Sequence, residues 1–308
     1  MTASSDPQSP IPRALAQIES VVLGKPQVVR LALACLIARG HLLIEDVPGV
    51  GKTTLARALA ATLGLSWRRI QCVADLLPGD ILGSSVYDSA SGGFRFHPGP
   101  VFASIVLADE LNRTSPRTQS ALLEAMEEGA VTSDGVRHQL PEPFFVIATQ
   151  NPREQAGTWP LPESQLDRFL MVLSLGFPSR DDERRLLASA AMRSAVESLS
   201  PELTSSDLVA AQTAAAQVHV SEPVREYLLD LIGASRGAAA SGAAAQTVNG
   251  LSPRATLGWQ RAAQAWALLS GRDAVYPEDV QAVATAVAAH RIGGPARVER
   301  LLRDVRVR

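Results

Sequence analysis

The sequence predicts an α/β fold, namely a core with a parallel sheet followed by a smaller all-helical domain. Short apolar runs alternate with helical patterns up to residue 175, as expected for parallel strands that are buried on both faces. After Gly176 the strand signals stop, and Ala-rich helical patterns continue toward the C-terminus. We therefore expect a disordered lead at residues 1–10, an α/β core at 11–177 and a helical lid domain at 178–308.

Five apolar runs are predicted to be the strands of the sheet. They are residues 41–45, 68–72, 104–109, 144–150 and 169–175. Two further segments, 84–96 and 130–140, have the Gly-Gly and Asp-Gly turn chemistry of β-hairpins and interrupt the alternation. A helix is predicted from Ser115, with Pro116 in its first turn and Gly129 at its end.

The second half of the chain is predicted to be helical. Helices are expected at roughly 180–193, 205–217, 222–235, 253–270 and 277–290. The stretch 233–250 is rich in Gly, Ala and Ser, so we expect a mobile loop there. At the C-terminus, RVERLLRDVRVR places its apolar residues on one helical face, which favours an amphipathic helix over a nucleic-acid patch.

Composition narrows the class of protein. Apolar residues make up 46% of the 308 residues, and no apolar run approaches the ~20 residues that cross a bilayer. The opening MTASSDPQSP lacks the features of a secretion signal, so we expect a cytoplasmic protein. The net charge of -2 gives no reason to expect nucleic acid. Cys35 and Cys72 are expected to be buried thiols, and the histidines lack the spacing of metal ligands.

The strongest motif is DVPGVGKTT at residues 46–54, between a predicted strand and a predicted helix. Backbone N–H groups at a helix N-terminus bind phosphates where glycines leave room, and a following lysine reaches the terminal phosphates. Asp46 stands where the strict pattern has its first glycine. We expect this loop to bind ATP, with the hydroxyl of Thr53 on Mg²⁺. The expected nucleotide-binding residues of the loop are Pro48, Gly49, Val50, Gly51, Lys52, Thr53 and Thr54.

Two polar strand ends complete the predicted pocket. Asp109 and Glu110 follow the apolar strand SIVLAD, at the edge of the sheet where ligands of α/β domains collect. We expect Asp109 to hold Mg²⁺ through water and Glu110 to polarise the attacking water. Asn151 ends the strand FFVIATQ and can orient that water without adding charge, although such residues more commonly make a turn.

The motifs together resemble the MoxR family of AAA+ ATPases, from about residue 11 to residue 290. The resemblance is carried by DVPGVGKTT, FRFHPGPVFASIVLADELNR, SALLEAMEEGAV, IATQNPREQAGTWPLPESQLDRF and LSPRA. It implies a P-loop core with a five-stranded sheet in the order 5-1-4-3-2, a helical lid, and two hairpins called the helix-2 insert and the pre-sensor hairpin. In the family, Asp commonly stands at the position of Asp46.

The resemblance also assigns roles to three polar residues. Asn151 is similar to sensor 1, Arg168 to the arginine finger that reaches a neighbouring subunit, and Arg254 to the sensor 2 arginine of the lid. We expect Arg254 to begin a helix that packs over the nucleotide. The competing interpretation of either arginine is a surface ion pair worth under about 1 kcal/mol. Arg113 and Arg117 fit a subunit interface or helix-start hydrogen bonds equally well.

By resemblance, the expected function is an ATP-hydrolysing chaperone or remodeller that acts as a ring, as a hexamer in AAA+ relatives. The expected partner carries a von Willebrand factor A domain, and clients are enzyme complexes during maturation. One alternative is a nucleic-acid motor or a magnesium-chelatase-like subunit, although the hairpins hold few basic residues. A second alternative is a nucleotide switch without hydrolysis, against which Glu110, Asn151, Arg168 and Arg254 argue together.

Overall fold

Five parallel strands form the central sheet of the protein. The computed structural model describes residues 10–90, 92–152, 156–188, 196–240 and 250–307. The strands run in the order β2-β5-β8-β1-β9. Counted within this sheet alone, that order is 2-3-4-1-5, which confirms the predicted 5-1-4-3-2 from the opposite edge. The sheet consists of β1 (Leu42–Glu45), β2 (Trp67–Gln71), β5 (Ile105–Asp109), β8 (Phe145–Gln150) and β9 (Met171–Leu173).

Helices cover both faces of this sheet, so its inner strands are buried on both sides. Along β8, Phe145 and Ile147 face one apolar cluster, whereas Val146 and Ala148 face the other. The first cluster includes the helices before and after β1, and the second includes the helix after β5. The helices of the core are α1 (Pro10–Val21), α2 (Pro26–Ile37), α3 (Lys52–Thr62), α4 (Pro78–Leu82), η1 (Leu111–Arg113), α5 (Pro116–Glu128) and α6 (Glu163–Leu166).

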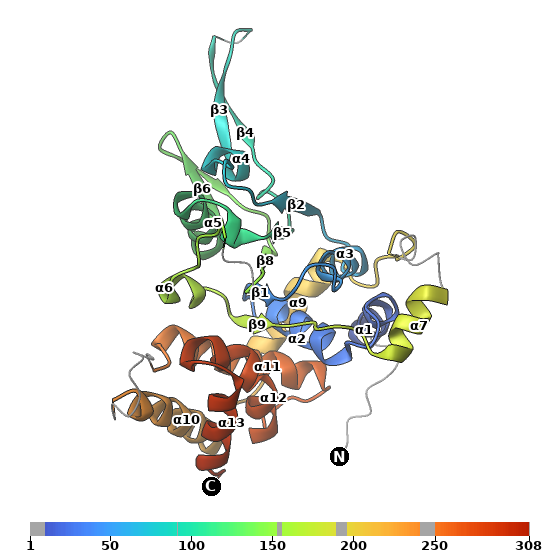
Figure 1. The fold of residues 1–308 in the computed structure, drawn as a ribbon, viewed down its shortest axis with the longest axis vertical. Helices are drawn as coiled ribbons and strands as arrows, with labels where there is room; N and C mark the ends of the chain where they lie inside the picture. The colour runs from blue at the N-terminus through green and yellow to red at the C-terminus, as the bar shows by residue number, and fades with distance from the viewer. Residues whose placement is uncertain (1–9, 91, 153–155, 189–195, 241–249, 308) are drawn as a thin grey trace.

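Both predicted hairpins are present. They are β3 (Gly83–Asp88) with β4 (Gly93–Pro98), and β6 (Ala130–Ser133) with β7 (Val136–Gln139). Asp134 and Gly135 both have positive φ, as a two-residue hairpin turn requires. The β3–β4 hairpin projects from one end of the long axis of the molecule, and the last helices gather at the other end (Figure 1).

The C-terminal half is helical, as predicted. It contains α7 (Arg180–Ala188), α9 (Ser205–Gln217), α10 (Glu222–Ala240), α11 (Pro253–Leu269), α12 (Pro277–Ile292) and α13 (Pro295–Asp304). The C-terminal segment is the expected amphipathic helix, because Val298 and Leu301 are buried in α13. Residues 1–9 and 189–193 lie outside the described part of the chain, and the domain boundaries stay predictions.

The expected loop at 233–250 is wrong in its first half, because α10 continues to Ala240. Alanine is the strongest helix former, and this stretch contains four of them between 234 and 240. Side chains also fix the helix to the segment before α11: the amide of Leu251 donates to the Ser235 hydroxyl at 3.2 Å, and Arg236 Nε donates to the Leu251 carbonyl at 2.9 Å. Residues 241–249 of the expected loop lie outside the described residues.

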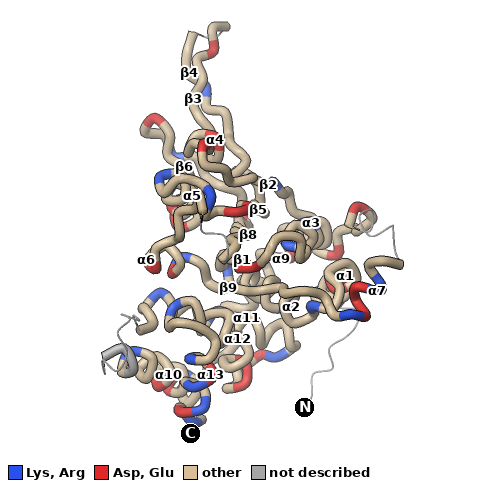
Figure 2. The backbone as a smooth tube through the Cα atoms, viewed as in Figure 1, with Lys and Arg blue, Asp and Glu red and all other residues tan. Residues whose placement is uncertain are grey.

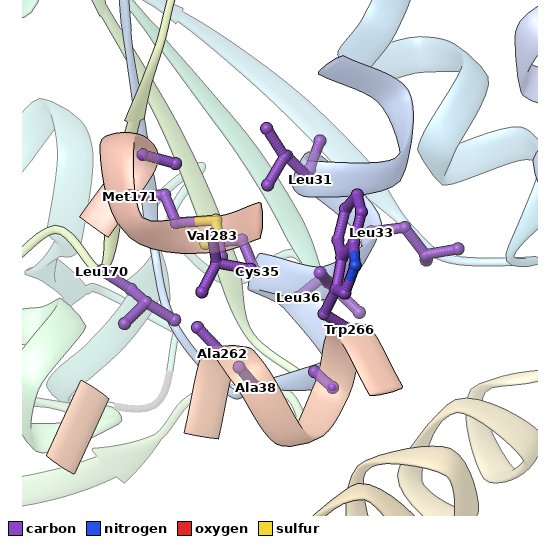
Figure 3. Close-up of a cluster of buried hydrophobic side chains, with 14 of the residues drawn as sticks. Leu31, Leu33, Cys35, Leu36, Ala38, Leu170, Met171, Ala262, Trp266 and Val283 are labelled. Carbon is purple, nitrogen blue, oxygen red and sulfur yellow. The ribbon is translucent and has the colours of Figure 1, made fainter. Parts of the chain in front are cut away.

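The lid helices are anchored to the core through α2 and β9. Figure 3 shows Leu36 and Cys35 of α2 and Met171 of β9 in one apolar cluster with Trp266 of α11 and Val283 of α12. Cys35 and Cys72 are free and buried, which confirms the expectation from sequence. Burial raises the pKa of both thiols, that of Cys72 to about 12, so neither is a reactive thiolate. Among the described helices, none has the length and apolar character needed to cross a membrane.

Candidate active site

The phosphate-binding loop follows β1 and leads directly into α3. Gly51 is the N-cap of α3 with a φ of 100°, and Gly49 has a φ of 86°; both values favour glycine. A β-carbon at Gly49 would meet no atom within 4 Å, so its surroundings are open. The N–H groups of the first turn of α3 point toward this open space, where a helix N-terminus favours an anion. Lys52 is buried and donates to the Asp46 carbonyl at 2.9 Å.

Asp46 connects the start of the loop to the chain after β9. Its carboxylate accepts hydrogen bonds from the amide of Gly176 at 2.7 Å and the hydroxyl of Ser174 at 3.0 Å. Burial by itself raises the pKa of Asp46, but these hydrogen bonds and one from the Val47 amide outweigh it and lower the pKa. Asp46 is not among the described residues with positive φ, so the missing glycine causes no strain there.

The carboxylates predicted to be catalytic lie at the carboxyl end of β5. Asp109 accepts a hydrogen bond from the Thr149 hydroxyl of β8 at 2.7 Å. The same hydroxyl accepts from the Glu110 amide at 2.8 Å. Glu110 is the N-cap of η1 and has a φ of 60°, which is uncommon for a residue with a side chain. Thr149 therefore holds both residues in place, because its hydroxyl donates to the Asp109 carboxylate and accepts from the Glu110 amide.

Cations and amides from neighbouring segments contact these two acids. Arg69 of β2 forms an ion pair with Asp109, with Nη2 2.6 Å from Oδ2. Gln71, also in β2, donates to Glu110 at 3.4 Å, and Arg113 pairs with Glu110 at 3.1 Å. The ion pair puts Arg113 at the carboxylate site. Arg117 is exposed in the first turn of α5.

Asn151 is brought between the loop and the two acids by the strand order. It directly follows β8, which lies between β5 and β1 in the sheet. Parallel strands end at the same edge, so the loop after β1, Asp109 and Asn151 share one edge of the sheet. We call it the carboxyl edge.

The residues of the carboxyl edge fit a nucleotide with Mg²⁺. The glycine loop, the helix N-terminus and Lys52 are the groups that bind phosphates. Thr53 and Asp109 offer hydroxyl and carboxylate oxygens, the ligands that Mg²⁺ prefers. Oδ2 of Asp109 accepts from both Nε and Nη2 of Arg69, whereas Oδ1 accepts only from the Thr149 hydroxyl, so Oδ1 retains a lone pair for a further hydrogen bond.

The two predicted arginines lie at the opposite edge. Arg168 precedes β9, and Leu170 donates from its amide to the carbonyl of His41, the residue before β1. This hydrogen bond places Arg168 at the amino ends of the strands. Arg254 lies there too, because Arg168 and Arg254 both pair with Glu127 near the end of α5. His41 Nε2 also contacts the Met126 carbonyl at 3.1 Å, which places the end of α5 at this amino edge. β1 alone separates the two edges by about 13 Å.

The expectation that the helix of Arg254 packs over the nucleotide is wrong for the loop of the same chain. α11 packs on α2 and α12, and both lid helices lie below β9 in Figure 1. The start of α11 faces the amino edge, where Arg254 pairs with Glu127. The sequence placed Arg254 correctly at a helix start, since Ser252 is the N-cap of α11. It did not reveal which edge of the sheet that helix start would face, because docking depends on the apolar contacts between α11 and α2.

A buried network holds the arginine edge together. Arg291 of α12 pairs with Asp167 at 2.7 Å and donates to the carbonyls of Asp167 and Phe169 at 3.0 and 2.7 Å. Asp167 also accepts from the hydroxyl of Ser252, two residues before Arg254, at 3.0 Å. Burial lowers the pKa of Arg291, and the ion pair with Asp167 opposes that shift. The segment around Arg168 is thus held by the lid.

Sequence reasoning missed Arg69, Thr149, Glu127 and Arg291. A signal was available for Glu127, because acidic residues at the end of a helix oppose the helix dipole and indicate a cationic partner. Arg69 had a weaker signal, as a charged residue inside a predicted buried strand. Thr149 and Arg291 had none, since a Thr in a strand and an Arg at a helix end are ordinary.

The fold and the site define a P-loop ATPase of the AAA+ class. The sequence matches the family described as "ATPase family associated with various cellular activities (AAA)" over residues 41–171, and an "AAA lid domain" over residues 239–306. A crystal structure of a protein from Cytophaga hutchinsonii superposes with a TM-score of 0.88 at 35% identity, covering 98% of this chain and 96% of that one.

Curated relatives specify the family further. The chain is 38% identical to Chaperone MoxR1 of Mycobacterium tuberculosis, over 91% of this chain and 74% of the relative. It is 34% identical to Protein MoxR of Paracoccus denitrificans, over 90% and 86%, and 46% identical to YeaC of Bacillus subtilis, over 91% and 86%. The chain belongs to the MoxR family of AAA+ ATPases.

Proposed function

We propose that this protein hydrolyses ATP at interfaces between subunits of a ring, and that the ring remodels client protein complexes. One observation carries the proposal: the loop and the acids lie at the carboxyl edge, whereas Arg168 and Arg254 lie at the amino edge. These arginines cannot reach the loop of their own chain across β1. A neighbouring copy can bring its arginine edge to the carboxyl edge of the next, and a head-to-tail contact of this kind closes into a ring.

Each group then has a separate role at the shared site. The loop with Lys52 binds the phosphates, Glu110 polarises the attacking water, and Asn151 orients it. Thr53, and Asp109 through water, would hold a Mg²⁺ ion, which would neutralise charge at the terminal phosphates. The neighbour's Arg168 and Arg254 stabilise the charge that develops on the transferred phosphoryl group.

A complementation experiment tests the shared site. Glu110→Gln removes the base of a subunit but leaves its arginine edge intact, and Arg168→Ala does the opposite. Each variant alone is expected to lose turnover. Co-assembled subunits regain it, because interfaces that join the loop of the Arg168→Ala subunit to the arginines of the Glu110→Gln subunit are complete. Mixed rings that stay inactive, with ring assembly verified by mass, would refute the shared site.

The two hairpins are suited to pass motion from the site to a client. α5 follows the catalytic acids and η1 in the chain, ends at Glu128, and leads directly into β6. Phe96 of β4 stacks on His138 of β7 with ring centroids 3.9 Å apart, so the hairpins contact each other. Near the tip of the projecting hairpin, Tyr87 and Phe94 are 58% and 77% exposed and offer an apolar contact surface.

The hairpins do not favour nucleic acid as the client. Figure 2 shows Lys and Arg interspersed with Asp and Glu along the chain, and the β3–β4 hairpin is mostly neutral. A partner with a von Willebrand factor A domain is part of the proposal, since it is the partner expected from the family. Capture from native extract with the Glu110→Gln form and ATP tests both points. Recovery of such a protein supports the proposal, and salt-dependent recovery of DNA or RNA would contradict it.

A further inference from the structure

The amino edge contains a hollow that the proposed roles do not fully use. Its lining includes Arg39, Arg168, Arg254, Arg261 and Arg291, together with the acids Glu127 and Asp167. Five guanidinium groups thus face two carboxylates, an excess of positive charge in one concave surface. Four of the five arginines have an acidic partner: Arg39 pairs with Glu142, Arg291 with Asp167, and Arg168 and Arg254 share Glu127.

Arg261 is the exception. No described residue accepts a hydrogen bond from its guanidinium group or forms an ion pair with it. It lines a second, smaller hollow together with Ile37 and Ala38 of α2, and although the residue is exposed overall, partial burial lowers the pKa of the guanidinium group. The guanidinium group thus faces solvent without a counter-ion among the described residues, so an anion that enters the hollow can pair with it.

The geometry of α11 places Arg261 beside the other two arginines. Arg254, Gly258 and Arg261 are spaced by four and three residues and so occupy one face of the helix. A β-carbon at Gly258 would lie 2.8 Å from the Leu170 side chain, so the glycine allows close approach of α11 to the segment after Arg168. Arg254 and Arg261 thus flank the chain that carries Arg168.

We infer that Arg261 is a third phosphate-contacting residue that acts on the nucleotide of the neighbouring subunit, together with Arg168 and Arg254. The ligand class is a polyphosphate, whose several oxygens match several guanidinium forks. Arg261 can pair with the neighbour's phosphates without breaking an ion pair, whereas the other four arginines have acidic partners. This inference rests on the proposed function.

Arg261→Gln tests the inference in the assembled ring. Removing one charged hydrogen bond to phosphate is expected to lower kcat roughly 10- to 100-fold. The affinity of the subunit's own loop for ATP stays unchanged, since Arg261 lies at the other edge. Arg261→Lys retains the charge and the stem and is expected to recover part of the rate. The matched control is Arg225→Ala in the same lid, which removes only an exposed pair with Glu222.

Mixing with Glu110→Gln subunits separates a trans role from a structural one. Recovery of turnover by the mixture of Arg261→Gln and Glu110→Gln subunits supports the inference, with about a quarter of the interfaces complete in random rings. Wild-type kcat in Arg261→Gln overturns it. The inference is also overturned if the mixture of Arg261→Gln and Glu110→Gln subunits stays inactive while the mixture of Arg168→Ala and Glu110→Gln subunits recovers turnover. If that reference mixture also stays inactive, the proposed function fails, and the inference falls with it.

Discussion

The guanidinium group of Arg168 lies 3.1 Å from the carboxylate of Glu127, which comes from a different element of the fold. The same carboxylate pairs with Arg254 of the lid. Glu127 is therefore the contact through which α5, the segment before β9 and α11 form one surface. It also lies near the end of α5, the helix that follows Glu110 and η1 in the chain, so α5 connects the two edges of the sheet.

Replacing Glu127 with Gln should separate the two arginines without disturbing the phosphate loop. We expect kcat of the assembled ring to fall about tenfold, the effect of one charged hydrogen bond, with KM for ATP unchanged. Steady-state ATPase assays check both constants. Glu128→Gln is the matched control, because its pair with Arg137 at 3.7 Å is exposed and worth under about 1 kcal/mol. Equal effects of the two substitutions would contradict the role of Glu127.

Thr149→Val should impair both the stability and the turnover of the protein. The substitution keeps the shape but removes the hydroxyl that donates to Asp109 and accepts from the Glu110 amide. We expect the free energy of unfolding to fall by about 1–3 kcal/mol and kcat to fall with it. Denaturant unfolding and ATPase assays measure these changes. Thr213→Val, on an exposed face of α9, is the control. If Thr149→Val left both the free energy of unfolding and kcat unchanged, the role of Thr149 in the site would be contradicted.

Asp46→Asn should loosen the phosphate loop from the chain after β9. The charged acceptor for Gly176 and Ser174 is lost, and we expect the free energy of unfolding at neutral pH to fall by about 1–3 kcal/mol. Since the pKa of Asp46 is lowered, its contribution is present above the ordinary pKa of 3.8 and is lost as pH falls through the lowered value. Asp134→Asn, at a hairpin turn, is the control and should change nothing. Equal stability of both variants would argue against the tether.

His41 should make the protein less stable in acid. Its ring accepts a hydrogen bond from the Val146 amide and contacts the Met126 carbonyl, and burial lowers its pKa from 6.5 to about 4. Between pH 6.5 and about 4, the unfolded chain therefore binds a proton at this histidine and the native protein does not. The free energy of unfolding thus decreases as the pH is lowered through this window, by up to about 3 kcal/mol. Unfolding from pH 7 to 4 should show a shallower fall for His41→Gln than for the wild type. His97→Gln, at an exposed site, should keep the wild-type slope, and an unchanged slope in His41→Gln would contradict the assignment.

Local patterns in the sequence were sufficient for most of the core. The glycines at 49 and 51, the strand ends at Asp109 and Asn151, and both hairpin turns depend on backbone conformation and on near neighbours, which a short segment specifies. The end of α10 was misjudged, because its low apolar content suggested a loop while its alanines and the contacts of Ser235 and Arg236 favour helix.

Motifs in the sequence were enough to predict a phosphate loop, two acids and two candidate arginines on an α/β core with a helical lid. Which edge of the sheet each of them faces depends on how the lid packs against the core. The lid docks through apolar contacts of α11 and α12 with α2 and β9, which are distant in sequence, and that packing carries Arg254 to Glu127 and Arg168 at the amino edge. The non-directional burial of apolar surface, which no local motif encodes, thus separates the arginines from the loop of their own chain.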